Sequence, residues 1–114
     1  MAVPVNKKFN TVELGIANMV AAANYDYNRF MPNNEEMQKE FADGWSMRYG
    51  KKYIKIVNRN SAWGFIVNTE DDKKFKKGDI LKCAGFNAPA RNRARGNVLS
   101  GGYRINWMGP EYLI

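Results

Sequence analysis

The sequence predicts an α+β fold in which an N-terminal helical hairpin packs on a small antiparallel β-sheet. Apolar residues recur at helical spacing through about the first 50 positions, whereas short β-rich runs between turn residues follow from Tyr53 onward. Helices that precede strands favour α+β over alternating units with a parallel sheet. A chain of 114 residues, 45% of them hydrophobic, suffices for a single domain spanning 1–114.

The first half predicts two amphipathic helices. The first covers about 11–30, capped by Asn10 or Thr11. The second starts near Asn33 or Asn34 and continues toward Gly50. The Pro-Asn turn between them predicts a helical hairpin. The apolar stripes are formed by Val12, Ile16, Met19, Val20, Ala23, Tyr27 and Phe30 in the first helix and by Met37, Phe41 and Trp45 in the second.

The second half predicts four strands, at 53–57, 63–67, 80–84 and 103–107. Residues 58–61 form a turn cluster, so the first two strands are expected to make a hairpin. Gly64 stands between two large aromatic residues, which indicates a bulge or the close approach of another backbone or a ligand. The chain closes with an apolar tail at 112–114, and this tail with the apolar helix stripes favours self-association.

The positive charge is concentrated in one segment. The chain carries 18 Lys and Arg against 11 Asp and Glu, a net charge of +7. Residues 73–95 hold eight of these cations and a single acid, Asp79, while the remainder is neutral. Such a distribution indicates a site for an anion, although lysines that guard a strand edge would give the same pattern. The cations are Lys73, Lys74, Lys76, Lys77, Lys82, Arg91, Arg93 and Arg95.

Two missing residue types restrict the chemistry. The chain has no histidine and one cysteine, Cys83, so the usual general base, Cys-His and Ser-His dyads, the commonest metal ligand and a multi-thiolate zinc site within one chain are excluded. We therefore expect a binding protein rather than an enzyme, without metal or cofactor. Cys83 is expected to be a small buried hydrophobe. No run is long enough to span a membrane and no signal peptide is evident, so we expect a cytoplasmic protein.

An arginine run between Pro89 and Gly96 is the strongest candidate site. If its middle forms one helical turn, Arg91 and Arg95 lie on one face while Arg93 points elsewhere. Two guanidinium groups on one face can hold one phosphate or two adjacent phosphates. A solvated basic loop is an equally good interpretation of the spacing.

Three segments of the C-terminal half resemble the phage-encoded Thoeris anti-defence proteins of the first type. They are Trp-Gly-Phe at 63–65, the run from Phe75 to Lys82, and the run from Ala88 to Val98. The most specific feature is Ala90-Arg91 followed by Arg95, which looks like the phosphate-binding arginine pair of that family. The N-terminal helices match no motif of the family.

The resemblance implies a sponge that binds cyclic ADP-ribose isomers made by bacterial TIR-domain enzymes, without cleaving them, in the host cytoplasm. It also implies a homo-oligomer, a dimer or a trimer of dimers, with ligand pockets between subunits. Some relatives are implied to hold cyclic trinucleotides at a second site. The expected ligand-binding residues are Arg91, Arg95, Ala90, Phe65, Asn92, Trp63 and Arg93.

The aromatic and amide residues have assigned roles in this hypothesis. Phe65 is expected to stack on adenine, with Trp63 on the same strand face holding it in place and Gly64 leaving room. Asn92 could pair with a base edge or a ribose. Ordinary structural roles remain open for both: a core residue for Phe65, and a turn or helix cap for Asn92.

Other classes of function remain open. A single-stranded nucleic-acid binder would also combine basic and aromatic residues, but no recognition motif supports it and the charge lies in one hairpin and one loop. An enzyme on a cyclic nucleotide would need a base among Glu70, Asp71, Asp72 and Asp79, which lie among lysines and are expected to be solvated. A protein that inhibits a defence enzyme by surface contact is the third alternative.

Overall fold

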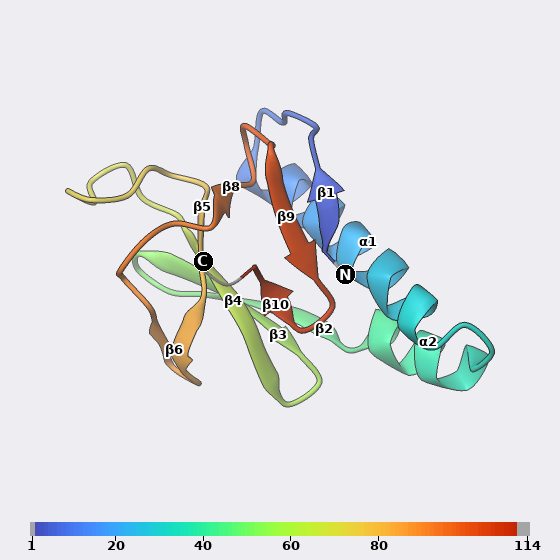
Figure 1. The fold of residues 1–114 in the computed structure, drawn as a ribbon. Helices are drawn as coiled ribbons and strands as arrows, with labels where there is room; N and C mark the ends of the chain where they lie inside the picture. The colour runs from blue at the N-terminus through green and yellow to red at the C-terminus, as the bar shows by residue number, and fades with distance from the viewer. Residues whose placement is uncertain (1, 112–114) are drawn as a thin grey trace.

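A computed structural model describes residues 2–111 of the chain. Two helices and ten short strands alternate with turns (Figure 1). In chain order the elements are β1 (Val3–Val5), α1 (Val12–Phe30), α2 (Glu35–Asp43), β2 (Trp45–Tyr49), β3 (Tyr53–Asn58), β4 (Ser61–Val67), β5 (Asp79–Leu81), β6 (Cys83–Gly85), β7 (Ala88–Pro89), β8 (Gly96–Asn97), β9 (Tyr103–Asn106) and β10 (Gly109–Pro110). The predicted α+β class is confirmed.

Both helices begin at polar caps that the sequence allows. Thr11 Oγ1 accepts a hydrogen bond from the Leu14 amide at 3.2 Å, and Asn34 Oδ1 accepts one from the Met37 amide at 3.0 Å. Each cap satisfies an amide that the first turn of a helix leaves without a partner. The observed α1 therefore agrees with the predicted first helix.

The second helix is shorter than predicted, because the chain turns into a strand at Trp45. The helix ends at Asp43 with Gly44 as its C-cap, and β2 pairs with β3 from Trp45↔Asn58 to Tyr49↔Ile54. The prediction that Trp45 extends the helical stripe of Phe41 is therefore wrong. The two rings still contact each other, with centroids 5.3 Å apart, but they belong to α2 and β2. A weak helix former at position 44 and a partner strand together favour the extended form.

Three antiparallel sheets make up the β part. The largest has the strand order β2-β3-β4-β5-β8, the second has β1-β9-β10, and β6 pairs with β7 alone. All four predicted strands are present, although the third is divided into β5 and β6. The very short strands β1, β7, β8 and β10 were not predicted, because two or three residues carry no recognisable period.

The main core lies between α1 and the two larger sheets. α1 lies across β1 and β9, and α2 packs at its far end (Figure 1). The buried face of α1, formed by Val12, Ile16, Met19 and Ala23, shares this core with residues of β3, β4, β5 and β9. No helix in the described part of the chain is long and apolar enough to cross a membrane. The apolar run at 112–114 falls outside the described residues.

The opposite face of the largest sheet carries a second, smaller apolar cluster. It is formed by Phe65, Val67, Phe75 and Leu81, with Tyr53, Cys83 and Ala94 packed at its edge. Cys83 is half-buried there, which agrees in part with its expected role as a buried hydrophobe, and burial raises the pKa of its thiol. The cluster is the layer on which the basic segment rests.

Candidate functional site

The arginine run lies along β5 and is not helical. The Ala90 amide donates a hydrogen bond to the Lys82 carbonyl at 2.7 Å, and the Arg95 amide donates one to the Ile80 carbonyl at 2.8 Å. Residues 90–95 between β7 and β8 contain no helical turn. The helical turn that would have placed Arg91 and Arg95 on one face is therefore absent, because backbone hydrogen bonds to the strand hold both ends of the run in place.

Arg91 is engaged by an acidic partner. Its Nη1 and Nη2 each donate to a carboxylate oxygen of Asp72 at 3.0 Å, and Nη1 also donates to the Tyr53 hydroxyl. Its guanidinium lies over the ring of Phe75, with Cζ 4.9 Å from the centroid. These contacts join the basic run to the loop between β4 and β5, so Arg91 already has the bidentate partner that a phosphate would provide.

Asp72 holds the loop between β4 and β5 together, and its side chain is only 1% exposed. Besides Arg91, its Oδ1 accepts hydrogen bonds from the amides of Lys74 and Phe75, at 2.8 and 3.0 Å. The hydrogen bonds from Arg91 and then from these amides hold the pKa of its carboxyl well below the usual range. The carboxylate is therefore an acceptor in the folded protein, and no sequence pattern indicated that this particular acid pairs with Arg91.

Arg95 lies in a different electrostatic environment. Its Nη2 donates to Asn92 Oδ1 at 3.1 Å, whereas its Nε and Nη1 are inaccessible to solvent and donate to no described residue. Burial, and then the positive charge of Arg93, lower the pKa of this guanidinium. Buried donors that lack an acceptor are rare and costly in folded proteins. Arg95 is thus the member of the predicted pair that still needs an acceptor.

Lys82 is a second partly buried cation in this region. Burial and then the charge of Arg95 lower the pKa of its amine. Its Nζ donates to the carbonyl of Pro110 at 2.8 Å. The sequence reasoning counted Lys82 in the basic segment but not in the site. Its position as a charged residue inside an apolar strand run was the signal that could have found it.

The remaining residues of the run have local structural roles. Asn92 Oδ1 accepts from the Arg93 amide at 2.8 Å as well as from Arg95, so its side chain shapes a turn, the alternative that the sequence left open. Arg93 is exposed, and Ala90 is half-buried beside Lys82. The Asn92 side chain thus also contacts the Arg95 guanidinium.

The two aromatic residues of β4 lie on opposite faces of the sheet. Ile56 pairs with Gly64 and Val57 with Ala62, so Trp63 is the extra residue of a β-bulge. The bulge turns Trp63 into the main core, while Phe65 lies in the second cluster. The expectation that both share one face is therefore wrong, although the bulge itself was predicted from Gly64.

Phe65 is not presented to solvent. Its exposure is 4%, and its ring contacts Tyr53 edge to face with the centroids 6.0 Å apart. This burial favours the alternative that Phe65 is a core residue. The space that Gly64 leaves is also occupied, since a Cβ there would lie 3.2 Å from Pro110 Cγ. Any base-stacking residue of this chain must therefore lie elsewhere.

Comparisons with protein-family models, with curated proteins and with solved structures find no match for this chain. The functional argument consequently rests on the geometry described above.

Proposed function

We propose that the chain binds a cyclic ADP-ribose-type signalling nucleotide at Arg95 and holds it without cleaving it. One observation carries the proposal: Nε and Nη1 of Arg95 are buried donors with no acceptor among the described residues. A guanidinium presents its N–H donors in fixed directions, and such donors suit the oxygens of a phosphate. A bound phosphate would supply these acceptors once the Arg95 side chain turned outward, because Nε and Nη1 are closed to solvent in this structure.

The charges around Arg95 support an anion rather than a neutral acceptor. Lys82 and Arg93 add to the positive charge around Arg95, and Lys82 is partly buried. Charges in a partly desolvated site attract an anion more strongly than exposed lysines do, because solvent and salt screen them less. A ligand with two adjacent phosphates, such as a cyclic ADP-ribose isomer, would neutralise the cluster best.

Arg91 has a positioning role in this proposal. It holds the loop of Asp72 against the run that carries Arg95, through the bidentate pair at 3.0 Å. A phosphate could displace Asp72 from Arg91 only by leaving that nearly unexposed carboxylate without its main partner, which is unfavourable. We therefore assign direct phosphate binding to Arg95, and loop positioning to Arg91.

Binding without turnover is consistent with the residues near the site. The chain has no histidine. Asp79 accepts hydrogen bonds from the Lys76 amide at 2.9 Å and from Asn97 Nδ2 at 2.9 Å, and Asp72 is bound to Arg91. A carboxylate engaged in this way is a poor general base, because its lone pairs already accept hydrogen bonds from fixed donors.

The biological setting of the proposal comes from the resemblance to the Thoeris anti-defence proteins. A phage protein of this kind would act in the host cytoplasm, remove the signal and keep the downstream effector inactive. A homo-oligomer, a dimer or a trimer of dimers, would place a second protomer beside Arg95. That protomer could supply the stacking aromatic that Phe65 does not provide.

The test is a capture experiment with intact protein. The chain is mixed with a panel of cyclic ADP-ribose isomers, cyclic oligonucleotides and single-stranded DNA, then separated, heated and analysed by chromatography. We expect release of one cyclic ADP-ribose isomer unchanged, and loss of capture in Arg95→Met but not in Arg48→Met, an exposed arginine of β2. A cleaved product would indicate an enzyme, and equal binding of single-stranded DNA would favour the nucleic-acid alternative.

A further inference from the structure

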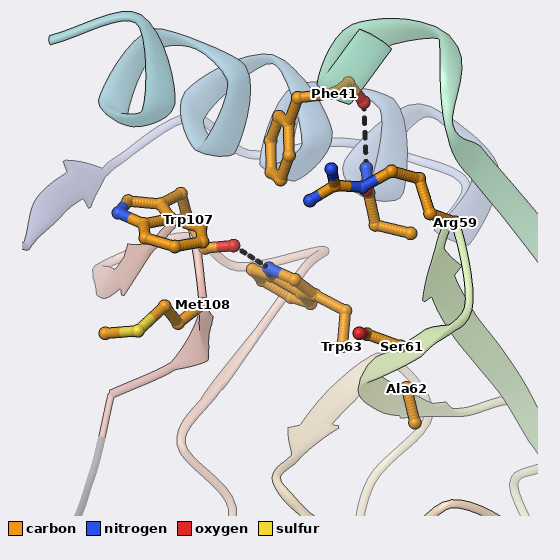
Figure 2. A pocket seen from close by; sticks show the side chains of 8 residues that line it. Phe41, Arg59, Ser61, Ala62, Trp63, Trp107 and Met108 are labelled. Carbon is orange, nitrogen blue, oxygen red and sulfur yellow. Dashed lines mark hydrogen bonds between the residues drawn. The ribbon is translucent and has the colours of Figure 1, made fainter. Parts of the chain in front are cut away.

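A hollow of about 240 Å³ lies apart from the basic run, between α2, the turn joining β3 to β4 and the turn joining β9 to β10 (Figure 2). Its walls are the rings of Phe41, Trp63 and Trp107, with Met108 and Arg59 at its rim. An apolar cavity of about 150 Å³ suffices to hold benzene. The hollow is therefore large enough for one or two fused rings.

The aromatic walls are held in place by hydrogen bonds to the backbone. Trp63 Nε1 donates to the Trp107 carbonyl at 3.0 Å, and Asn58 Nδ2 donates to the Phe41 carbonyl at 2.8 Å (Figure 2). The rings of Phe41 and Trp107 meet edge to face, with centroids 6.2 Å apart. Because these polar groups are satisfied within the wall, they fix its shape and leave aromatic surface for a ligand.

Arg59 reaches the hollow through an unusual backbone. Its φ of 56° is positive, which no other non-glycine residue in the described chain shares. Its amide donates to the Gly44 carbonyl at 2.7 Å, and a Cβ at position 44 would lie 2.7 Å from Arg59 Cγ. Left-handed backbone at a non-glycine residue is unfavourable and is concentrated at functional positions. The helix end at Gly44 thus makes room for this one side chain.

The guanidinium of Arg59 keeps one donor available. Its Nε donates to Asn58 Oδ1 at 3.1 Å and its Nη1 to the exposed Glu40 at 3.3 Å, whereas no described residue accepts from Nη2. Figure 2 shows the group directed toward the space between Phe41, Trp63 and Trp107. Its Cζ lies 5.8 Å from the centroid of the Phe41 ring, so a cationic ligand among these rings would meet a like charge.

We propose that this hollow binds a small planar aromatic molecule that carries an anionic group. The ring would lie against the half-exposed Trp107, over the nearly buried Phe41 and Trp63, and the anion would accept a hydrogen bond from Arg59 Nη2. An aromatic carboxylate and a nucleobase with a phosphate share this chemistry. The site is independent of Arg95, because no residue that lines it belongs to the basic run at 88–98.

The test uses the full chain with four probes. Indole-3-acetate and adenosine monophosphate each combine a ring with an anion, indole has the ring alone, and acetate has the anion alone. Binding of all four probes is followed by calorimetry. Quenching of the fluorescence of Trp63 and Trp107 is a second readout for adenosine monophosphate and acetate, because the two indole probes emit where tryptophan does. We expect one or both aromatic anions to bind at least tenfold more tightly than indole, and acetate not to bind.

Variants of Arg59 identify the anion contact. Arg59→Asn removes the charge with a residue that tolerates positive φ, and should weaken binding about tenfold or more, the usual contribution of a hydrogen bond to a charged group. Arg59→Lys keeps the charge without the planar fork and should lose less. The matched control, Arg48→Asn on β2, should bind as the native chain does.

Two results would overturn the proposal. In the first, indole binds as tightly as the aromatic anions and Arg59→Asn, shown to be folded by its thermal transition, changes nothing. In the second, none of the probes binds at millimolar concentration. Indole-3-acetate carries no phosphate, so its binding is independent of the proposal for Arg95. Binding of adenosine monophosphate that Arg59→Asn does not weaken belongs to the phosphate site and not to the hollow.

Discussion

Replacing Arg95 with methionine should stabilise the ligand-free protein while it abolishes nucleotide binding. In the native chain two guanidinium nitrogens are buried without an acceptor among the described residues. A buried polar group without a partner costs about 1–3 kcal/mol, and the lower end applies here because the residue as a whole is only half-buried. Methionine has similar length and no polar hydrogen, so it removes this cost and fills the same space.

The two effects have opposite signs and can be measured separately. A gain of about 1 kcal/mol corresponds to a rise of roughly 3–6 °C in Tm for a chain of this size. Loss of a hydrogen-bonded partner of a charged ligand costs about 2–5 kcal/mol, which weakens binding roughly 30-fold to several thousand-fold. Calorimetric titration with the captured nucleotide and thermal unfolding without it give both numbers.

The opposite result would refute the reasoning. If Arg95→Met lowers Tm and leaves nucleotide binding unchanged, the guanidinium has a structural role and the site does not exist. Arg91→Met is the matched control, because it removes an arginine that already has a partner in Asp72. Arg91→Met should lower Tm. Any loss of nucleotide binding in Arg91→Met should follow from displacement of the loop that carries Asp72.

Three further predictions concern the rest of the chain. The pKa of Asp72 is lowered in the folded protein, so the stability that its carboxylate provides is present above about pH 4 and is lost as the pH falls through the folded pKa. Asp72→Asn should remove this acid dependence of the free energy of unfolding, measured by denaturant unfolding at several pH values. Phe65→Ala should destabilise the fold by about 3–5 kcal/mol, as expected for a buried ring, whereas native stability with lost binding would restore its stacking role. Light scattering at micromolar concentration should give a dimer or a larger even-numbered oligomer, since Leu14 and Phe30 of α1 are exposed; a monomeric mass would contradict a shared pocket.

The periodic parts of the fold could be predicted from the sequence. The apolar stripe of α1 and the cap at Thr11 are local features, because helical spacing and a side chain that accepts an amide act within a few residues. The β-rich runs of β3 and β4 and the bulge at Gly64 belong to the same class. The sequence also located the positive charge and the arginine run, since both are properties of composition.

What became of those residues depended on contacts distant in sequence. Trp45 lies in a strand and not in the helix because β3 pairs with it, and the bulge places Trp63 on the opposite face of the sheet from Phe65. Arg91 and Arg95 look equivalent in the sequence. The loop at Asp72, 19 residues earlier, satisfies Arg91, whereas the packing of the run along β5 buries Arg95 with two donors unsatisfied. Only tertiary structure decides which of two identical side chains meets a carboxylate, because the pairing joins segments that no local pattern connects.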